Sequence, residues 1–331
     1  MATPREIRRR IRSIKNIAKV TRAMEMVAAA KMRRAQQQVL AMRPYAEKAW
    51  EVLVHLASQR GVSEELHPLL RRRPVVSRVG LVLITSNKGL CGAYNHNVLR
   101  LADDFLERTP VPVELITVGR VGRNAMLRAG RPILADFENI PDQPSLTDVR
   151  PVARVAIDDF LSGRLDEVYL LYTDFVNTMV QRPHVRRLLP LPCVTFETDQ
   201  PWCPVSPTIS QTEYVYEPDP RELLEGLLPR FTELQIYEAL LEASASEHSA
   251  RMVAMRSATD NAQDLVADLT LTYNQARQAA ITKEMLDIAG GTEALAKMKG
   301  REFAERMPAQ SSALSSRRGA GWRFTGESVG G

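Results

Sequence analysis

Residues 1–60 carry a hydrophobic pattern typical of one long amphipathic helix. Small and apolar residues recur at alternating spacings of four and three, which places them on one side of a helix. They form a single seam: Ile7, Ile11, Ile14, Ala18, Thr21, Ala28, Met32, Ala35, Val39 and Met42. Thr3 and Pro4 suit a cap and first turn, with Glu6 as the capping partner. We therefore predict a helix over residues 1–60, with a kink at Pro44.

A second and longer helix is predicted near the other end of the chain. Between Arg230 and Ala289, sixty residues contain neither Gly nor Pro, and Gly290 with Gly291 is typical of a helix end. Its seam residues are Leu241, Ala245, His248, Met252, Met255, Thr259, Ala262, Val266, Leu269, Tyr273, Ala276 and Ala280. We place this helix at residues 219–291 and a flexible Gly/Ser/Arg tail at 296–331. Sixty helical residues would span about 90 Å, more than a globular domain of this size can cover.

The two helices are expected to pair because their charges are opposite. Residues 1–43 contain twelve Lys or Arg and two Glu, whereas residues 219–290 contain six basic and twelve acidic side chains. An antiparallel coiled coil joins such helices from opposite ends of a chain. Its seam is rich in small residues where Leu and Ile would bury more apolar surface. This indicates either a weakly packed coiled coil or a rod that is kept thin. The end of the longer helix outruns its partner and must be exposed or covered by another molecule.

Residues 75–215 change to a pattern of alternating strands and helices. Apolar and β-branched runs predict strands at 78–85, 113–118, 131–137, 168–175 and 179–189. Helical segments are expected from 92 to about 107, over 119–130, and from a cap at Ser145 or Thr147 to Leu161. This alternation predicts a partly parallel, Rossmann-like α/β domain. The predicted fold class is therefore α/β plus a long antiparallel coiled coil of the N- and C-terminal helices.

The loop from Ser86 to Gly92 is the most enzyme-like feature of the chain. It lies between a strand and a helix, where backbone N–H groups can hold phosphate, but it fits neither known glycine-rich phosphate motif. The Gly119-Arg-Val-Gly122 segment is equally incomplete. We favour a structural turn built on Gly89, Cys91 and Gly92 over nucleotide binding, and a reactive thiol at Cys91 stays open.

Composition excludes several classes of protein. With 44% hydrophobic and 25% charged residues and no apolar run of about 20 residues, an ordinary water-soluble protein is expected. Five dispersed histidines and three cysteines show no metal-ligand spacing, so we expect no metal, no cofactor and no catalytic residue. His248 lies on the seam as a core histidine. Cys193 and Cys203 could pair within a proline-rich linker, although redox regulation is the less favoured interpretation.

The basic N-terminus has another interpretation, and two other classes of protein stay open. The basic N-terminus resembles a mitochondrial transit peptide, but its helical pattern continues without a cleavage-like break. A net charge of +5 keeps open a basic coiled-coil nucleic-acid binder, and the loop at 86–92 keeps open a small nucleotide-dependent enzyme. Neither class accounts for the sixty-residue helix.

Five segments together carry a resemblance to a known family. They are TRAMEMVAAAKMRRAQ (21–36), GLCGAYN (89–95), LLPLP (188–192), SEHSARMVAMRSATDNA (246–262) and YNQARQAAITKEMLDIAGG (273–291). In order and separation, over about residues 1–295, they resemble the gamma subunits of F-type ATP synthases. The resemblance implies a non-catalytic central rotor shaft that couples proton flow through the membrane sector to ATP synthesis or hydrolysis, and that regulates ATPase activity.

The same resemblance implies partners and a location. The partners are the alpha and beta subunits of the catalytic ring, the epsilon subunit and the ring of c subunits. Nucleic acid is not expected, and membrane contact is expected only through the complex. Because neither a transit peptide nor the inserted dithiol loop of the plant chloroplast proteins is seen, the resemblance favours a bacterial enzyme at the cytoplasmic face of the cell membrane.

Roles for individual residues also follow from the resemblance. Arg277 and Gln278 resemble the pair that hydrogen-bonds a catch loop of a beta subunit, with Thr282 and Glu284 nearby. Lys283 stands where Gln is common, which makes this local pattern less typical. Arg22 and Met24 match the segment that faces the acidic lever of a beta subunit, and a basic side chain there suits a moving acidic partner.

Two segments depart from the pattern of the family. The turn reads Ser86-Asn87-Lys88 where many members have Ser-Asp-Arg, a conservative change in a structural loop. The chain also continues for about 35 residues beyond Leu295, where family members usually end. This tail is interpreted either as an unselected basic extension or as a segment that emerges from the far end of the ring or acts as a brake on rotation.

Overall fold

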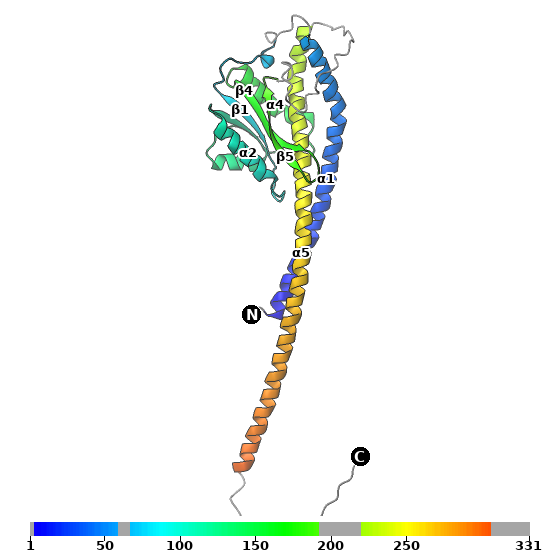
Figure 1. The fold of residues 1–331 in the computed structure, drawn as a ribbon, viewed down its shortest axis with the longest axis vertical. Coiled ribbons are helices and arrows are strands. Elements are labelled where there is room, and N and C mark those ends of the chain that lie inside the picture. Colours follow the sequence, from blue (N-terminus) through cyan, green and yellow to red (C-terminus); the bar gives the residue numbers. More distant parts are fainter. Residues whose placement is uncertain (1–2, 59–66, 192–219, 306–331) are drawn as a thin grey trace, which may run out of the picture. The chain divides into compact units, whose positions relative to one another are not determined.

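The computed structural model describes residues 3–58, 67–191 and 220–305. The chain divides into two compact units, one of residues 10–267 and one that contains residues 1–9 and those from 268 onward. Two long helices, α1 (Pro4–Ser58) and α5 (Pro220–Glu305), have residues in both units (Figure 1). The predicted Cys193–Cys203 pairing, and the part of the predicted tail beyond residue 305, lie outside the described residues.

Helix α1 begins and continues as the sequence predicts. The Thr3 backbone N–H donates to the Glu6 carboxylate at 3.0 Å, and the N–H groups of Glu6 and Ile7 donate to the Thr3 carbonyl. These bonds satisfy donors that a bare helix start leaves unpaired. The helix continues through Pro44, and every predicted seam residue of α1 is buried or half-buried. The predicted seam is therefore confirmed.

Helix α5 extends beyond its predicted end at Gly290 and Gly291. It continues to Glu305, so the prediction of a stop at the double glycine was wrong. Neither glycine adopts the positive φ of a helix-ending residue. The segment that follows is rich in good helix formers, and Glu293 pairs with Lys297 one turn later at 2.9 Å. Favourable neighbours on both sides thus outweigh the cost of two glycines, about 1 kcal/mol each.

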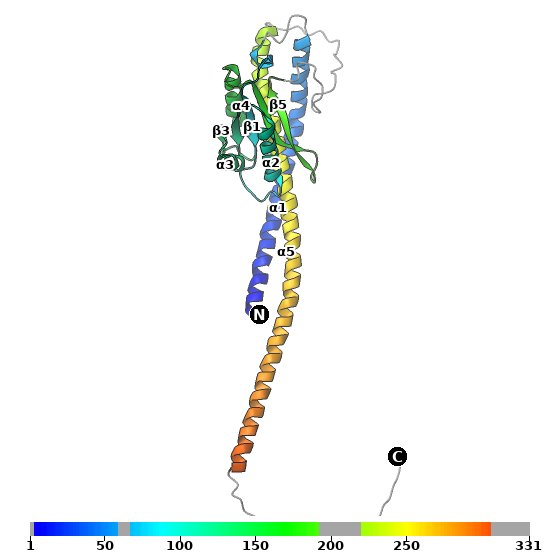
Figure 2. The same ribbon diagram turned by 60° about the vertical axis from the view of Figure 1, so that its left-hand side comes forward.

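Within the unit of residues 10–267, α1 and α5 lie side by side and run in opposite directions (Figures 1 and 2). The Thr21 hydroxyl hydrogen-bonds the Thr259 hydroxyl at 2.7 Å, whereas Leu53 shares a core cluster with Leu224. Low numbers in one helix therefore meet high numbers in the other, and the antiparallel pairing is confirmed. The α5 seam is also confirmed from Leu241 to Ala276, but Ala280 is exposed and does not belong to it.

The α/β domain is a five-stranded sheet in the order β3-β2-β1-β4-β5. Its strands are β1 (Val79–Ile84), β2 (Val113–Val118), β3 (Ile133–Phe137), β4 (Glu167–Phe175) and β5 (Gln181–Leu189). The first four are parallel, and β5 runs antiparallel to β4. The helices are α2 (Tyr94–Arg108), α3 (Arg120–Arg128), α4 (Leu146–Leu161) and the short 3₁₀ helix η1 (Pro68–Leu70). All predicted strands and helices of this domain are present, and Ser145 caps α4.

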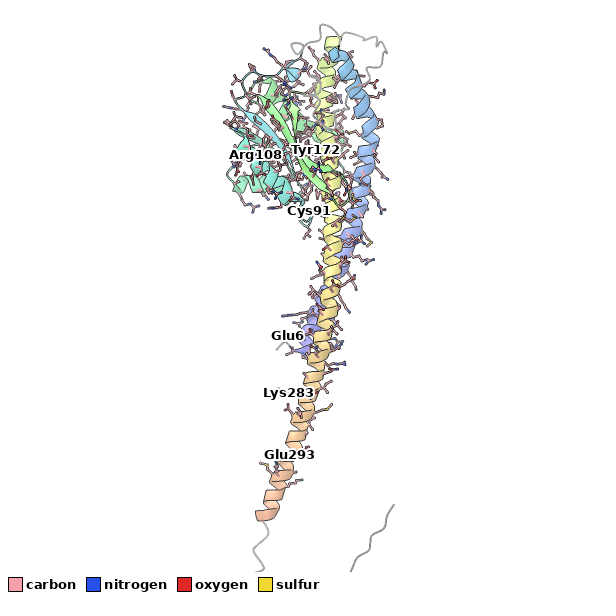
Figure 3. The ribbon with its side chains drawn as sticks, viewed as in Figure 1. Glu6, Cys91, Arg108, Tyr172, Lys283 and Glu293 are labelled. Carbon is pink, nitrogen blue, oxygen red and sulfur yellow. The ribbon has the colours of Figure 1, made fainter. Side chains whose placement is uncertain are left out.

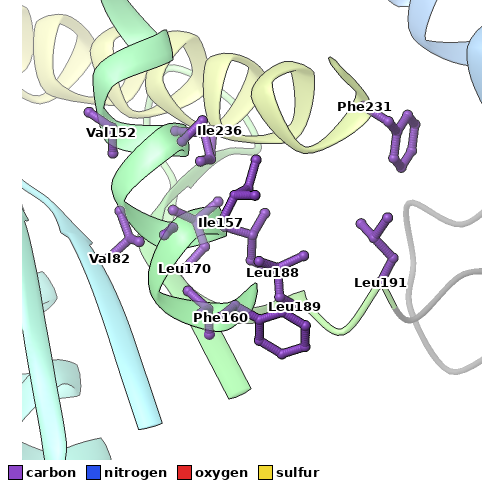
Figure 4. Close-up of a cluster of buried hydrophobic side chains, with 14 of the residues drawn as sticks. Val82, Val152, Ile157, Phe160, Leu170, Leu188, Leu189, Leu191, Phe231 and Ile236 are labelled. Atoms are coloured by element: carbon purple, nitrogen blue, oxygen red, sulfur yellow. The ribbon is translucent and has the colours of Figure 1, made fainter. Parts of the chain in front are cut away.

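The sheet buries both of its faces, as a parallel sheet requires. Alternate residues of β1 point to opposite sides: Val82 and Ile84 join one cluster, and Leu81 and Leu83 join the other. The first cluster includes α4 and the beginning of α5, where Phe160 of α4 and Ile236 of α5 approach β4 and β5 (Figure 4). The second cluster lies under α2 and α3. Helix α5 is therefore part of the domain core and not only half of a coiled coil.

Candidate partner-binding surfaces

The turn at 86–92 is held by side chains of its own segment. The Ser86 backbone N–H donates to Asn95 Oδ1 at 3.2 Å, and Asn95 Nδ2 donates to Ser86 Oγ at 2.7 Å. Ser86 Oγ in turn donates to the Lys88 carbonyl at 2.8 Å. The polar groups that could have faced a ligand are thus engaged in closing the turn, which supports the structural interpretation.

Glycine is required at one of the two predicted positions of this turn. Gly92 has φ +58°, and a Cβ there would lie 3.7 Å from the Cβ of Ala254 in α5. Gly89 has no positive φ, and a Cβ would meet nothing within 4 Å, so the predicted need for glycine there was wrong. Leu90 takes the left-handed conformation instead, with φ 63° and an exposed side chain. A leucine in that region is strained.

Arg251 of α5 clamps the turn. Its Nη2 donates to the carbonyls of Lys88 and Gly89, both at 3.2 Å, and its Nη1 pairs with Glu247 at 2.7 Å. The Arg251 side chain is only 12% exposed, so these charge-assisted bonds form with little competition from water. The GLCGAYN segment therefore fixes the α/β domain to α5.

The same helix covers the carboxyl edge of the parallel sheet. Ser246 Oγ donates to the Thr173 carbonyl at the end of β4 at 3.2 Å, and Ser249 Oγ donates to the Thr178 carbonyl at 2.8 Å. Open α/β sheets bind ligands outside this edge, where the strand order reverses. Here the reversal lies between β1 and β4, and residues of α5 occupy the adjoining space. This arrangement argues against the nucleotide-dependent enzyme.

The second glycine pair has a packing explanation as well. A Cβ at Gly119 would lie 2.2 Å from the Thr85 carbonyl oxygen, and one at Gly122 would lie 2.7 Å from Thr85 Oγ1. The Gly122 N–H donates to that same hydroxyl at 2.9 Å. The two glycines therefore allow α3 to approach the end of β1, and their spacing does not indicate a phosphate site.

Cys91 and His248 are buried without a reactive partner. Cys91 is 2% exposed, and burial raises the pKa of its thiol, which keeps the thiol protonated at neutral pH (Figure 3). Burial and the nearby cations Arg251 and Lys31 lower the pKa of His248 to about 4, so this imidazole is neutral. The prediction of a core histidine is confirmed. Among the described residues, no cluster of His, Cys, Asp or Glu could hold a metal ion.

A groove of about 720 Å³ runs beside the residues assigned to the beta lever. Its wall contains the half-buried Met24 and the exposed Val20 and Val27, and Arg22 on the same helix is also exposed. Lys31 and Arg251 also line the groove, where Lys31 pairs with Asp142 on the opposite wall and Arg251 pairs with Glu247. The sequence prediction contained Arg22 and Met24 but missed the groove, because its other wall comes from residues more than 60 positions away.

The residues assigned to the beta catch loop lie on the second unit. Arg277, Gln278, Thr282 and Glu284 are all exposed on α5. Between them on the helix surface, at spacings of four and three, lie Ile281, Met285 and Ile288, which are 44%, 64% and 62% exposed. From residue 277 to 299 every side chain of α5 is exposed. An apolar stripe of this length on an exposed helix indicates a surface that a partner covers, and the sequence prediction missed its three apolar members.

The described part of the chain offers no helix that is both long and apolar enough to cross a membrane.

Comparison with known proteins identifies relatives of this chain. A family model described as ATP synthase matches residues 3–295. The ATP synthase gamma chain of Roseiflexus castenholzii is 51% identical over 301 residues, which cover 90% of this chain and all of that relative. The gamma chain of Dehalococcoides mccartyi is 48% identical over 296 residues, again across its full length. The relatives therefore match about nine tenths of the chain.

Solved structures show the same fold. A chain in the Euglena gracilis mitochondrial ATP synthase, described as OSCP/F1/c-ring in rotational state 3, aligns with a TM-score of 0.60 at 18% identity, covering 94% of this chain and 99% of that one. A chain of the central stalk and c-ring of the Tetrahymena thermophila enzyme aligns with a TM-score of 0.53 at 23% identity, covering 72% of this chain and 99% of that one. With the extent of the family match and the identity to curated relatives, the chain belongs to the ATP synthase gamma chain family.

Proposed function

We propose that this chain is the central shaft of a rotary ATP synthase and transmits torque to a ring of alpha and beta subunits. The chain is a non-catalytic member of its family, and its surfaces fit that role. The observation that carries the proposal is the exposed segment of α5 from 277 to 299 with its apolar stripe. A partner that covers the apolar stripe would add packing stability to this exposed helix.

The physical basis of the proposed mechanism is asymmetry. A single helix presents different side chains to each of three equivalent catalytic subunits, so each subunit has a different balance between open and closed states. Shifting a two-state site from 1:99 to 99:1 requires about 5.5 kcal/mol of differential contact energy. One charge that crosses 100 mV supplies roughly 2.3 kcal/mol, so several protons must combine in each catalytic step.

Torque must pass between the α/β domain and α5, and the clamp at the turn provides a route. Arg251 ties the 86–92 turn to α5, while Ser246 and Ser249 tie the end of β4 and the following loop to the same helix. The hydrogen bonds at the sheet edge and the apolar core under α4 together resist sliding and rotation of α5 against the α/β domain. We propose that this rigid junction couples the domain to the shaft.

The proposed partners follow from the two kinds of surface. The alpha and beta subunits would surround α5, with Arg277, Gln278, Thr282 and Glu284 at a beta catch loop. The groove that contains Met24, together with the exposed Arg22, would face an acidic lever of a beta subunit. The α/β domain would contact the epsilon subunit and the c-subunit ring. In this proposal the protein lies at the cytoplasmic face of a bacterial cell membrane and contacts the membrane only through the complex.

Reconstitution tests the proposal directly. Matching alpha and beta subunits are mixed with or without the full chain, and both ATPase turnover and elution volume on size exclusion are measured. We expect one stable complex that contains the chain and has a greatly increased turnover. Separate elution with unchanged turnover would contradict the shaft role.

A further inference from the structure

Leu90 in the 86–92 turn combines a strained backbone with an exposed apolar side chain. Its φ of 63° lies in the left-handed region, which is unfavourable for a residue with a bulky side chain. The side chain is 65% exposed, so packing within the chain does not offset the strain. Gly or Asn would adopt the same backbone more easily. The stability of the isolated chain therefore gives no reason for a leucine at this position.

The turn is held on both sides of Leu90, so the strained conformation persists. Arg251 donates to the carbonyls of the two residues before Leu90, both at 3.2 Å. On the other side, a Cβ on Gly92 would lie only 3.7 Å from the Cβ of Ala254 in α5. These contacts fix the backbone and hold the leucine side chain out in solvent. Strained residues that persist in this way cluster at sites of function.

The tip of the β4–β5 hairpin displays a second exposed apolar side chain near the turn. Met179 at this tip is 75% exposed. Its backbone N–H donates to Asn177 Oδ1 at 2.9 Å. Ser249 of α5 donates to the Thr178 carbonyl at 2.8 Å, so the tip is fixed to α5 as the turn is. The end of the turn, the tip and α5 together line a hollow of about 180 Å³.

The beginning of the turn lines the groove of about 720 Å³, and the free charge of that groove is positive. All carboxylates that line the groove are in ion pairs: Glu138 with Arg123, Asp142 with Lys31, and Glu247 with Arg251. Lys88 and Arg120 also line it, are exposed, and form no ion pair with another described residue. Leu90 therefore lies between a hollow and a groove, beside two free cations, and a partner that covers it is expected to be acidic.

We propose that Leu90 is an apolar anchor, displayed at a cost in stability, that docks on an acidic segment of a beta subunit. This inference rests on the proposed shaft function, and it adds a contact on the α/β domain to those proposed for α1 and α5. The partner segment would offer an apolar pocket to Leu90 and carboxylates to Lys88 and Arg120. Because the turn and the hairpin tip are fixed before binding, their docking loses little conformational entropy.

Leu90→Asn tests both parts of the proposal, because Asn accepts the left-handed backbone and removes the apolar side chain. In the isolated full chain, we expect the melting temperature measured by circular dichroism to rise by about 2–4 °C as the strain is relieved. In a complex with alpha and beta subunits, we expect the chain to dissociate about tenfold faster, since the buried leucine contact is lost. Release of labelled chain into an excess of unlabelled chain measures this rate.

Two further variants separate the anchor from a general effect of altering the surface. Met179→Ser has no strain to relieve, so it should speed dissociation without raising the melting temperature. Leu127 is 52% exposed on α3 and lines neither the hollow nor the groove. Leu127→Asn is therefore the matched control, and it should dissociate at the wild-type rate.

The two measurements distinguish failure of the anchor from failure of the shaft function. If the wild-type chain forms no complex with alpha and beta subunits, the proposed function fails and the docking of Leu90 fails with it. If the wild type forms the complex and Leu90→Asn dissociates at the same rate, only the anchor is overturned. A lower melting temperature for Leu90→Asn would show that Leu90 stabilises the chain itself, and this result would also overturn the anchor.

Discussion

At the scale of single residues, glycines that look alike in the sequence have different physical roles. Gly119 and Gly122 make room for Thr85, where any Cβ would approach within 3 Å. Gly92 adopts a left-handed conformation against Ala254, whereas Gly89 is free of both constraints. A glycine is therefore necessary only where φ or a close approach requires it, and the printed sequence does not distinguish these cases.

Substituting the glycines one at a time with alanine separates these roles. Gly119→Ala combines a φ of +101° with a Cβ 2.2 Å from a carbonyl oxygen, so we expect a loss of about 3 kcal/mol or more in the free energy of unfolding. Gly92→Ala should cost about 1–2 kcal/mol, the cost of a left-handed residue with a side chain. Urea unfolding followed by circular dichroism gives the order. The control Gly89→Ala should stay within about 0.5 kcal/mol of wild type, and a loss as large as that of Gly92→Ala would refute this explanation.

The residues also show how far sequence reasoning reaches at this scale. Burial of His248 could be predicted because the helical period places it on the seam. The bonds of Arg251 to the carbonyls of residues 88 and 89 could not, because they join positions more than 160 residues apart. Periodicity describes which side of an element is buried, but it does not identify the element that covers it.

At the scale of elements, α5 changes its role along its length. Its first part belongs to the domain core, its middle covers the sheet edge and pairs with α1, and its residues 277–299 are exposed. The sequence predicted the helix and its seam from the period of small and apolar residues. It misplaced the end because a double glycine is a local signal, whereas helix formers on both sides extend the helix to Glu305.

The clamp between α5 and the turn predicts the effect of removing Arg251. Arg251→Met would leave the Lys88 and Gly89 carbonyls and the half-buried Glu247 without their cation, at an expected cost of about 2–3 kcal/mol. The pKa of Glu247, already raised by burial, should rise further because Arg251 lowers it. Hydrogen exchange of the 86–92 amides should become faster while α1 exchange stays unchanged.

A second substitution separates loss of the clamp from loss of charge balance. In Arg251→Met with Glu247→Gln, no buried carboxylate is left unpaired, so part of the stability should return. The turn should still exchange faster, since the bonds to its carbonyls remain absent. Full recovery of slow exchange in the double variant would show that Arg251 acts only by neutralising Glu247.

At the scale of the whole molecule, the sequence predicted the components better than their connections. Opposite charge and a shared seam indicated that the two terminal helices pair, and the alternating pattern indicated the sheet. Docking of α5 on the carboxyl edge was not predicted, because Ser246 and Ser249 have no sequence signal that links them to β4. The contacts that would transmit torque in the proposed function are thus the ones that periodicity does not predict.

The proposed function makes its sharpest prediction on the exposed surface of α5. Arg277 and Gln278 are exposed, flank an apolar stripe on the same helix, and contribute nothing to the core. Arg277→Ala with Gln278→Ala should therefore leave the helicity of the isolated chain unchanged. In the assembled complex with alpha and beta subunits, it should lower ATP hydrolysis about tenfold, the effect of losing about 1.4 kcal/mol of contact energy. Circular dichroism of the chain and steady-state ATPase assays of the complex measure the two effects.

Lys283→Ala is the control because Lys283 lies about 160° around the helix axis from both Ile281 and Met285, at 100° per residue, and so faces away from the apolar stripe. A general effect of altering an exposed helix would lower turnover equally in both variants, whereas a specific contact would affect only the first. Equal losses would therefore contradict the assignment of Arg277 and Gln278 to a beta subunit. Unchanged turnover in the double variant would show that Arg277 and Gln278 do not belong to the partner-binding surface. The apolar stripe of Ile281, Met285 and Ile288 would then remain as the part of α5 that a partner covers.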